Sequence, residues 1–395
     1  MEADKAHALP LTPIDYVFTG NSAYPVGFVF HYRYRIDAAR LHAALAQILL
    51  AFRSATYRLE AISTTQYVLS PHQGEVAFST AAMPSRRAAD MPSYDCIDSV
   101  QTRENEPLCR IRLTETADGT ALGISFSHVV ADGFSCFYFL AELAKAFRQE
   151  PLSAPELDRG WYQPRPFVLA KPLTSAEAID LTGFARGRHR QDIPQSDVAW
   201  EHIHVSEAEV AGLMAEASAQ TACRLSRNDV LTAYLWKKYV PQWLGSQTAE
   251  DASFCLPFDV RRFSHWVSPR HFGNGICLAG AHLPYKRFSA ASLGELAALV
   301  RATVDKVTED YARTAYDVFG ATREREGLAA MGEFHVSDQC SGILVTNLSR
   351  VPLESVDFGA GAPFSFATVA DAPRAAIVLP AADGFQIDVC LPRAG

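Results

Sequence analysis

One stretch in the first half of the chain changes from a strand pattern to a helix pattern within a few positions. Apolar side chains alternate with small or polar ones over 121–130, which is the period of two of a β-strand. From Phe134 onward they recur at three-and-four spacing, as on the buried face of an amphipathic helix. The sequence therefore predicts a buried strand that leads directly into a helix, with His128, Asp132 and Gly133 at the junction.

A histidine at such a junction is placed for proton chemistry. The unperturbed pKa of imidazole lies nearest to neutrality, so His128 can take a proton from a hydroxyl or amine nucleophile. A structural alternative explains the same residues: Asp132 is the N-cap of the helix, and His128 is an ordinary core histidine. This segment alone leaves both interpretations open.

A second motif lies near the C-terminal end. Residues 342–348 have the apolar character of a buried strand, and D-F-G-A-G follows at 357–361. Gly359 and Gly361 permit backbone angles that other residues resist, as in an ordinary turn. A dinucleotide-binding loop is not indicated, because the G-x-G-x-x-G pattern is broken at Phe364.

The two motifs together resemble the paired signatures of the BAHD family of acyl-CoA-dependent acyltransferases. Those signatures are H-x-x-x-D and D-F-G-W-G, in the order in which 128–133 and 357–361 occur here. Two ordered motifs are far more specific than one. The resemblance extends over nearly the whole chain, and the further segments similar to family elements are 11–15, 226–236, 259–262, 272–274 and 377–391.

The chain departs from the family pattern at two positions where bulk is lost. Ala360 replaces the tryptophan of D-F-G-W-G, and Leu348 aligns with a tryptophan often found in the preceding strand. An indole N–H can support a developing oxyanion, so its absence at Leu348 leaves the Thr346 hydroxyl as the candidate donor. At 395 residues the chain is also shorter than is typical of the family, which suggests an altered acceptor pocket.

The resemblance implies an α+β fold of two chloramphenicol-acetyltransferase-like domains, each a mixed sheet with flanking helices, which enclose a channel. Proline recurs between positions 151 and 194, and such a stretch is poor material for the interior of a helix or central strand. We therefore expect an N-terminal domain with H-x-x-x-D-G, a crossover, and a C-terminal domain with D-F-G-A-G, bounded as 1–160, 161–200 and 201–395. The periodicity also predicts one continuous helix over 293–311.

The resemblance also implies a mechanism. Acyl-CoA and the acceptor enter the channel from opposite faces, and His128 at its midpoint deprotonates the acceptor without an acyl-enzyme. Asp132 forms a salt bridge with Arg261 and so positions the histidine loop. The expected catalytic residues are His128 and Thr346, and the expected structural support of the site is Asp132, Gly133, Arg261, Asp357, Gly359 and Gly361.

Basic residues are candidates for binding the CoA phosphates. The densest basic run lies in the expected crossover, which usually supplies such contacts in the resembled family, although a short basic run is usually only solvated surface. Acyl-CoA is then a cosubstrate, and no permanently bound cofactor is expected. The candidate contacts are Arg186, Arg188, Arg190 and Arg262.

Composition excludes several classes of protein. The formal net charge of −8 argues against nucleic-acid binding, which usually demands a basic face. No apolar run of about eighteen residues occurs, and the start of the chain lacks the regions of a signal peptide, so we expect no membrane association. Cysteines are scattered singly without C-x-x-C, as in a reducing compartment, which indicates a cytoplasmic protein.

Two further expectations concern metals and assembly. His202 and His204 lie two apart on an expected strand, but exposed strand histidines explain them more simply than a metal site. We therefore expect no bound metal. We also expect a monomer, because the resembled family is mostly monomeric.

Three hypotheses about function follow. The leading one is an acyl-CoA-dependent O- or N-acyltransferase that acts on a small specialised metabolite. The second is a condensation or offloading enzyme with a carrier-protein-tethered donor; related condensation domains read H-H-x-x-x-D-G, and Ser127 stands at the first of these positions. The third is a repurposed fold that binds or cyclises a hydrophobic intermediate, as the loss of bulk at Ala360 and Leu348 suggests.

Overall fold

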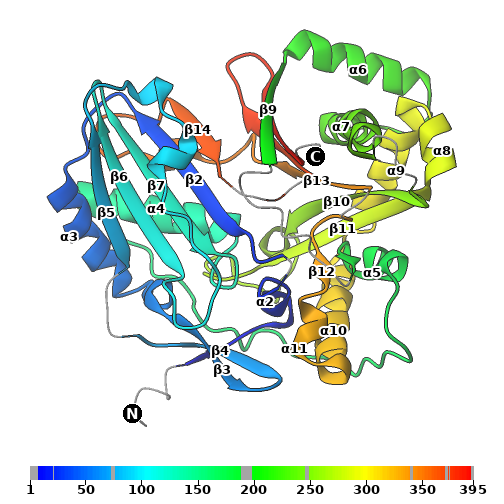
Figure 1. The fold of residues 1–395 in the computed structure, drawn as a ribbon, viewed down its shortest axis with the longest axis horizontal. Helices are drawn as coiled ribbons and strands as arrows, with labels where there is room; N and C mark the ends of the chain where they lie inside the picture. Colours follow the sequence, from blue (N-terminus) through cyan, green and yellow to red (C-terminus); the bar gives the residue numbers. More distant parts are fainter. Residues whose placement is uncertain are drawn as a thin grey trace. The chain divides into compact units, whose positions relative to one another are not determined.

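The computed structural model describes residues 8–392 except 21, 73–75, 188–197, 245–248, 339–340, 370–371 and 373. The chain divides into two compact units (Figure 1). Unit 1 comprises 1–163, 265–275 and 351–370, and unit 2 comprises 164–264, 276–350 and 371–395. Each unit is therefore built from three separate stretches of the chain, whereas the sequence predicts domains that are each one continuous stretch.

Unit 1 is built on a mixed sheet. Among the described residues its strands in spatial order are β14 (Ser365–Thr368), β2 (Pro25–Tyr32), β7 (Thr120–Ser127), β6 (Cys109–Thr116) and β5 (Ala77–Met83). Strands β5 and β6 are parallel, and the other neighbours are antiparallel. A small sheet joins β1 (Leu9–Pro10), β4 (Gln66–Ser70) and β3 (Arg58–Ser63).

Helices α3 (Ala38–Leu49) and α4 (Gly133–Arg148) cover one face of this sheet (Figure 1). Aromatic side chains make the contact: the ring of Phe137 on α4 lies 5.1 Å from that of Phe28 on β2. Phe139 lies 5.3 Å from Phe126 on β7. The apolar stripe predicted from the sequence is therefore the face of α4 that packs on the sheet, and this packing fixes the end of β7 where the histidine follows.

The D-F-G-A-G loop belongs to unit 1, although the sequence placed it in the C-terminal domain. The physical reason is β14, which pairs antiparallel with β2 at the edge of the unit 1 sheet directly after the loop. A strand of four residues is too short for its pairing partner to be deduced from the sequence.

Unit 2 contains a larger mixed sheet. Among the described residues its strands in spatial order are β11 (Ile276–Pro284), β10 (Asp251–Asp259), β13 (Gly342–Asn347), β15 (Ala375–Pro380), β16 (Phe385–Pro392) and β9 (Val198–Val205). Strand β13 is parallel to both of its neighbours. The mixed sheets with flanking helices in both units confirm the predicted α+β fold class.

Helices line both faces of the unit 2 sheet (Figure 1). Those on one face share a core with the sheet that includes Trp236 and Phe254, whose rings lie 4.9 Å apart; they are α6 (Glu207–Ala219), α7 (Arg227–Leu244), α8 (Tyr285–Ala290) and α9 (Leu293–Asp305). The other helices are α5 (Ser175–Thr182), α10 (Glu309–Glu326) and α11 (Leu328–Met331), which are followed by the short pair β8 (Ala185–Arg186) and β12 (Phe334–His335).

The continuous helix expected over 293–311 is wrong. The chain forms α9 and α10 with a break between them, because Thr308 is an extended N-cap whose side chain accepts from the Tyr311 amide at 3.2 Å. Apolar periodicity continues across such a cap, so it does not reveal the break. No helix in the described part of the chain combines the length and the apolar character needed to cross a membrane.

We expect Gly123→Ala on β7 to destabilise unit 1. A Cβ at this position would lie 2.0 Å from the carbonyl oxygen of Cys96, which belongs to backbone that cannot swing away. Overpacking of this kind lowers the free energy of unfolding by about 1–3 kcal/mol. Gly133→Ala is the matched control, because a Cβ there meets no atom within 4 Å. Urea denaturation of both variants tests this, and equal midpoints would contradict it.

Candidate active site

His128 lies in the turn between β7 and α4, as the sequence predicts. Asp132 is the N-cap of α4: its Oδ1 accepts from the Ser135 amide at 2.8 Å. Its Oδ2 accepts from the Gly275 amide at 2.9 Å. The carboxylate therefore caps the helix and also holds the segment that follows Phe272 against the histidine turn.

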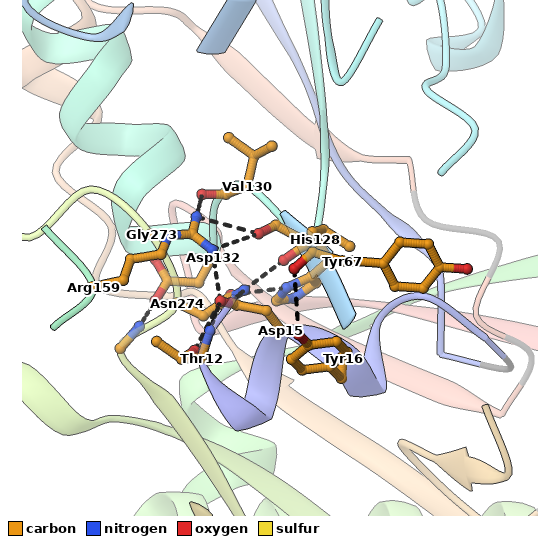
Figure 2. A network of polar contacts seen from close by, with 12 residues as sticks. Thr12, Asp15, Tyr16, Tyr67, His128, Val130, Asp132, Arg159, Gly273 and Asn274 are labelled. Carbon is orange, nitrogen blue, oxygen red and sulfur yellow. Dashed lines mark hydrogen bonds and ion pairs between the residues drawn. The ribbon is translucent and has the colours of Figure 1, made fainter. Parts of the chain in front are cut away.

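Asn274, in the F-G-N element of that segment, contacts His128 twice (Figure 2). Its Nδ2 donates to the carbonyl oxygen of His128 at 2.6 Å, and its Oδ1 lies 3.1 Å from Nδ1 of the imidazole. Because Nδ2 also donates to Asp15 Oδ1 at 2.7 Å, the amide orientation is fixed by two acceptors. The amide oxygen therefore accepts from Nδ1–H, and the lone pair of the imidazole lies on Nε2.

Phe18 covers one face of the imidazole. The two rings are stacked, with centroids 3.8 Å apart and planes 14° from parallel. Asn274 at one edge and Phe18 on one face therefore fix the plane of the ring. Nε2 of His128 has no hydrogen-bond partner within the described ranges, so this nitrogen is available to a substrate proton.

A buried ion pair between Asp15 and Arg159 adjoins the histidine turn (Figure 2). Arg159 Nη1 is 2.6 Å from Asp15 Oδ2, and the side chains are 1% and 0% exposed. Arg159 also donates to the carbonyl oxygens of Val129 and Val130, the two residues after His128. The pair thus connects helix α2 (Pro13–Val17), which carries Asp15, with the histidine turn.

The surroundings keep His128 neutral. Burial lowers the pKa of the imidazole from 6.5, and the carboxylates of Asp132 and Asp15 and the hydrogen bond with Asn274 offset this only in part. A neutral imidazole with a protonated Nδ1 is the form that a general base requires. The direction of the pKa shift therefore suits proton abstraction near neutral pH.

We expect the acid limb of the kcat/KM profile to have its midpoint below pH 6.5. His128 must be unprotonated to act, and its lowered pKa keeps it unprotonated to more acidic pH, so activity is lost only as the pH falls through that value. The measurement is kcat/KM between pH 5 and 9 with a hydroxyl acceptor that does not itself titrate there. A midpoint above 6.5 would show that the carboxylates outweigh burial.

The D-F-G-A-G loop has a clear structural basis. Asp357 Oδ1 accepts from the amides of Gly359 and Gly361 at 2.7 and 2.9 Å. These glycines have φ values of 103° and 113°, a region that other residues rarely adopt. Arg148 at the C-terminal end of α4 donates to the carbonyl oxygen of Asp357. The loop lies at the opposite end of the helix from His128, roughly 24 Å away for a helix of this length.

Two of the remaining predicted residues belong to unit 2. Thr346 is on β13 in unit 2, and Arg261, whose Nη1 is 3.0 Å from Asp259 Oδ1, also belongs to unit 2. The predicted catalytic part of Thr346 and the predicted ion pair between Asp132 and Arg261 stay predictions. Gly133 has no positive φ, and an added Cβ would meet no atom within 4 Å, so its position does not require glycine.

The structure argues against Arg186 as a phosphate contact. Its side chain is 6% exposed, and its guanidinium lies 2.7 Å from Glu326 and 3.1 Å from Glu333. Two carboxylates already neutralise this charge, which the sequence could not show because they lie about 140 residues away. Arg188 and Arg190 lie outside the described residues, and Arg262 is exposed.

His202 on β9 lies beside a carboxylate. Its Nδ1 is 2.7 Å from Asp388 Oδ1, and no group of three or more His, Cys, Asp or Glu in the described part of the chain is arranged to hold a metal ion. His202 therefore has a neighbouring carboxylate as its partner.

Sequence reasoning did not assign a part to Asp15, Phe18, Arg159 or Asn274. Asp15 and Asn274 lie in segments that resemble family elements, and Thr12-Pro13 before Asp15 is a readable helix start. Nothing in the sequence signals Arg159 or the stacking of Phe18, because both contacts join distant segments.

Comparisons with known proteins identify the family of this chain. The model of a family described as the Transferase family matches residues 3–395. Hydroxycinnamoyltransferase 2 of Oryza sativa subsp. japonica is 24% identical over 393 residues, covering 88% of this chain and 82% of that protein. Hydroxycinnamoyl-CoA:5-hydroxyanthranilate N-hydroxycinnamoyltransferase HHT1 of Avena sativa is 24% identical over 344 residues, covering 83% and 77%.

A solved structure shares the fold. TRI101 of F. sporotrichioides, complexed with coenzyme A and T-2, superposes with a TM-score of 0.78 at 17% identity, covering 97% of this chain and 95% of that one. The family match spans both units and includes the histidine turn and the D-F-G-A-G loop. The chain therefore belongs to this transferase family, the BAHD family of acyl-CoA-dependent acyltransferases, which act on small-molecule acceptors.

Proposed function

We propose that the protein transfers an acyl group from acyl-CoA to a hydroxyl or amine of a small specialised metabolite, with His128 as the general base. The observation that carries this proposal is the imidazole itself. Its Nδ1 faces an amide oxygen, its ring is stacked on Phe18, and its Nε2 has no partner among the described residues. These are the properties of a base held ready for a substrate proton.

The reaction proceeds by direct attack. Nε2 of His128 accepts the proton of the acceptor's O–H or N–H as its heteroatom forms a bond with the thioester carbonyl carbon. The oxyanion that develops needs a donor, for which we propose the Thr346 hydroxyl. When the intermediate collapses, the C–S bond breaks and the imidazolium returns the proton to the CoA thiolate, so no proton is gained or lost.

The names of the curated relatives suggest which acyl-CoA donors to test first. The two curated relatives described above are hydroxycinnamoyltransferases by name, and one is named for transfer to the nitrogen of an anthranilate. We therefore propose hydroxycinnamoyl-CoA thioesters as the first donors to test, with both hydroxyl and aromatic amine acceptors. The predicted channel, and the predicted CoA-phosphate contacts other than Arg186, belong to this proposal as well.

The cellular compartment and the oligomeric state of the protein are also proposals. Each cysteine in the described part of the chain is a free thiol, and most of them are buried. Free thiols are typical of a reducing compartment, which supports a cytoplasmic enzyme. We propose that it acts as a monomer, and a molecular mass measured by light scattering tests this.

The experiment is thiol release from a panel of acyl-CoA donors and acceptors, with mass detection of the product. Release that depends on the acceptor and yields an acylated product supports the proposal. If calorimetry shows that the protein binds CoA but no acceptor in the panel yields a product, its acceptor lies outside the panel. Failure to bind CoA would favour a carrier-tethered donor or a pocket that no longer transfers acyl groups.

A further inference from the structure

We infer that Asp15 is a positioning residue for acyl transfer: its buried carboxylate fixes the amide of Asn274, and that amide fixes which imidazole nitrogen of His128 carries the proton. The inference rests on the proposed function of His128. It assigns a role in the reaction to the N-terminal helix α2, whose Asp15 lies 113 residues before His128 in the sequence.

The two carboxylate oxygens of Asp15 have different partners, which supports its role in positioning Asn274. Oδ2 of Asp15 accepts from the amide and hydroxyl of Thr12, at 2.7 and 2.8 Å, and lies 2.6 Å from Arg159 Nη1. Oδ1 accepts from Asn274 Nδ2 at 2.7 Å. Capping of α2 and pairing with Arg159 thus use one oxygen, and within the described ranges the other is directed at Asn274.

The consequence for the amide is geometric. If Asn274 flipped, its oxygen would face Asp15 Oδ1 and the His128 carbonyl oxygen at 2.7 and 2.6 Å, and acceptors cannot share a hydrogen bond at such distances. The flipped amide would also donate to Nδ1, which stabilises the tautomer with a protonated Nε2. That tautomer cannot accept a substrate proton at the open nitrogen.

Asp15 supplies one of the two acceptors that prevent this flip. In Asp15→Asn the remaining side-chain oxygen is held by the donors of Thr12 and Arg159, so an amide nitrogen replaces Oδ1 opposite Asn274. Two facing donors favour the flipped Asn274 amide, and the wrong tautomer of His128 becomes accessible. The carboxylate also stabilises the imidazolium that forms during transfer, acting through the polarised amide. The charged groups around His128 that take part are Asp15, Arg159 and Asp132.

A purely structural part for Asp15 predicts something different. Arg159 links Asp15 to the carbonyl oxygens of Val129 and Val130, so loss of the pair can disturb the histidine turn by displacement alone. Displacement of the histidine turn would weaken CoA binding and also lower the free energy of unfolding. A change of tautomer would lower kcat with CoA binding unchanged.

The test measures the tautomer and the rate in the same variants. Asp15→Asn is compared with wild type and with Thr12→Val, which removes a hydrogen bond to Oδ2 but leaves the contact of Oδ1 with Asn274. Nitrogen NMR of ¹⁵N-histidine-labelled protein at pH 8 reports which ring nitrogen of His128 is protonated, and His128→Gln assigns the signal. kcat and the calorimetric Kd for CoA are measured alongside.

We expect wild type and Thr12→Val to show a protonated Nδ1. In Asp15→Asn we expect a signal of protonated Nε2 and a fall in kcat of about 10²-fold, with the Kd for CoA within twofold of wild type. An unchanged tautomer or an unchanged kcat would overturn the inference. If wild type itself transfers no acyl group, the proposed function fails, while the NMR comparison still decides the part of Asp15.

A second variant guards against misfolding. Asp15→Asn leaves Arg159 as a buried unpaired charge, so the double variant Asp15→Asn/Arg159→Gln removes both charges together. The same change of tautomer is expected in the double variant. A folded double variant with the wild-type tautomer would overturn the inference.

Discussion

His128→Ala is expected to lower kcat by about 10²–10⁴-fold, the range that a positioned general base contributes. The methyl group can neither take up the proton of the acceptor nor donate a hydrogen bond to Asn274 Oδ1. Binding of CoA should change little, because the variant removes a group that acts on the acceptor's proton. Steady-state thiol release gives kcat, and calorimetry gives the Kd for CoA.

The matched control is His202→Ala. This histidine is 62% exposed and pairs with Asp388 in unit 2, so its loss should leave kcat within about twofold of wild type. Partial recovery of the His128→Ala rate by added imidazole would identify the lost group as a base. A His128→Ala protein that keeps more than a tenth of the wild-type kcat would contradict the assignment.

Local patterns in the sequence predicted the elements that carry His128. The period changes from two to three-and-four at the junction, and the structure has β7 and α4 at that place. An N-cap at Asp132 does not exclude a catalytic His128, because the capping carboxylate also holds the histidine turn. The structural role of Asp132 therefore supports the catalytic role of His128.

The partners of His128 could not be predicted, because they come from distant segments. Asn274 lies 146 residues from the histidine, and Asp15 lies 259 residues from Asn274. Periodicity reports only which face of an element is buried, and a motif reports only that a segment resembles a family. Neither indicates which buried amide or guanidinium will meet the imidazole.

The same limit explains the two misplaced features. Arg186 belongs to a basic run that reads as a binding surface, but Glu326 and Glu333 approach it from α10 and the turn after α11. The D-F-G-A-G loop follows a strand of unit 2, but its own hydrogen bonds and β14 place it in unit 1. In both places long-range pairing decides the outcome.

The second large effect is expected from Arg159→Met, which should lower the free energy of unfolding by about 3–5 kcal/mol. The arginine is 1% exposed and is the partner of an equally buried carboxylate, so its removal leaves Asp15 charged without compensation. Methionine fills the aliphatic part of the site, so the loss reports mainly the charge and the hydrogen bonds to the histidine turn.

Arg35→Met separates this effect from a general loss of arginine. Arg35 pairs with Glu115 in the same unit, but the side chains are 67% and 46% exposed. Exposed pairs contribute about 0–1 kcal/mol, because water screens them and the side chains lose freedom when they pair. Urea denaturation followed by tryptophan fluorescence compares the two variants with wild type. If Arg159→Met and Arg35→Met unfold at the same urea concentration, the buried pair does not stabilise the histidine turn, and the hydrogen bonds of Asp15 with Thr12 and Asn274 are enough to hold its carboxylate.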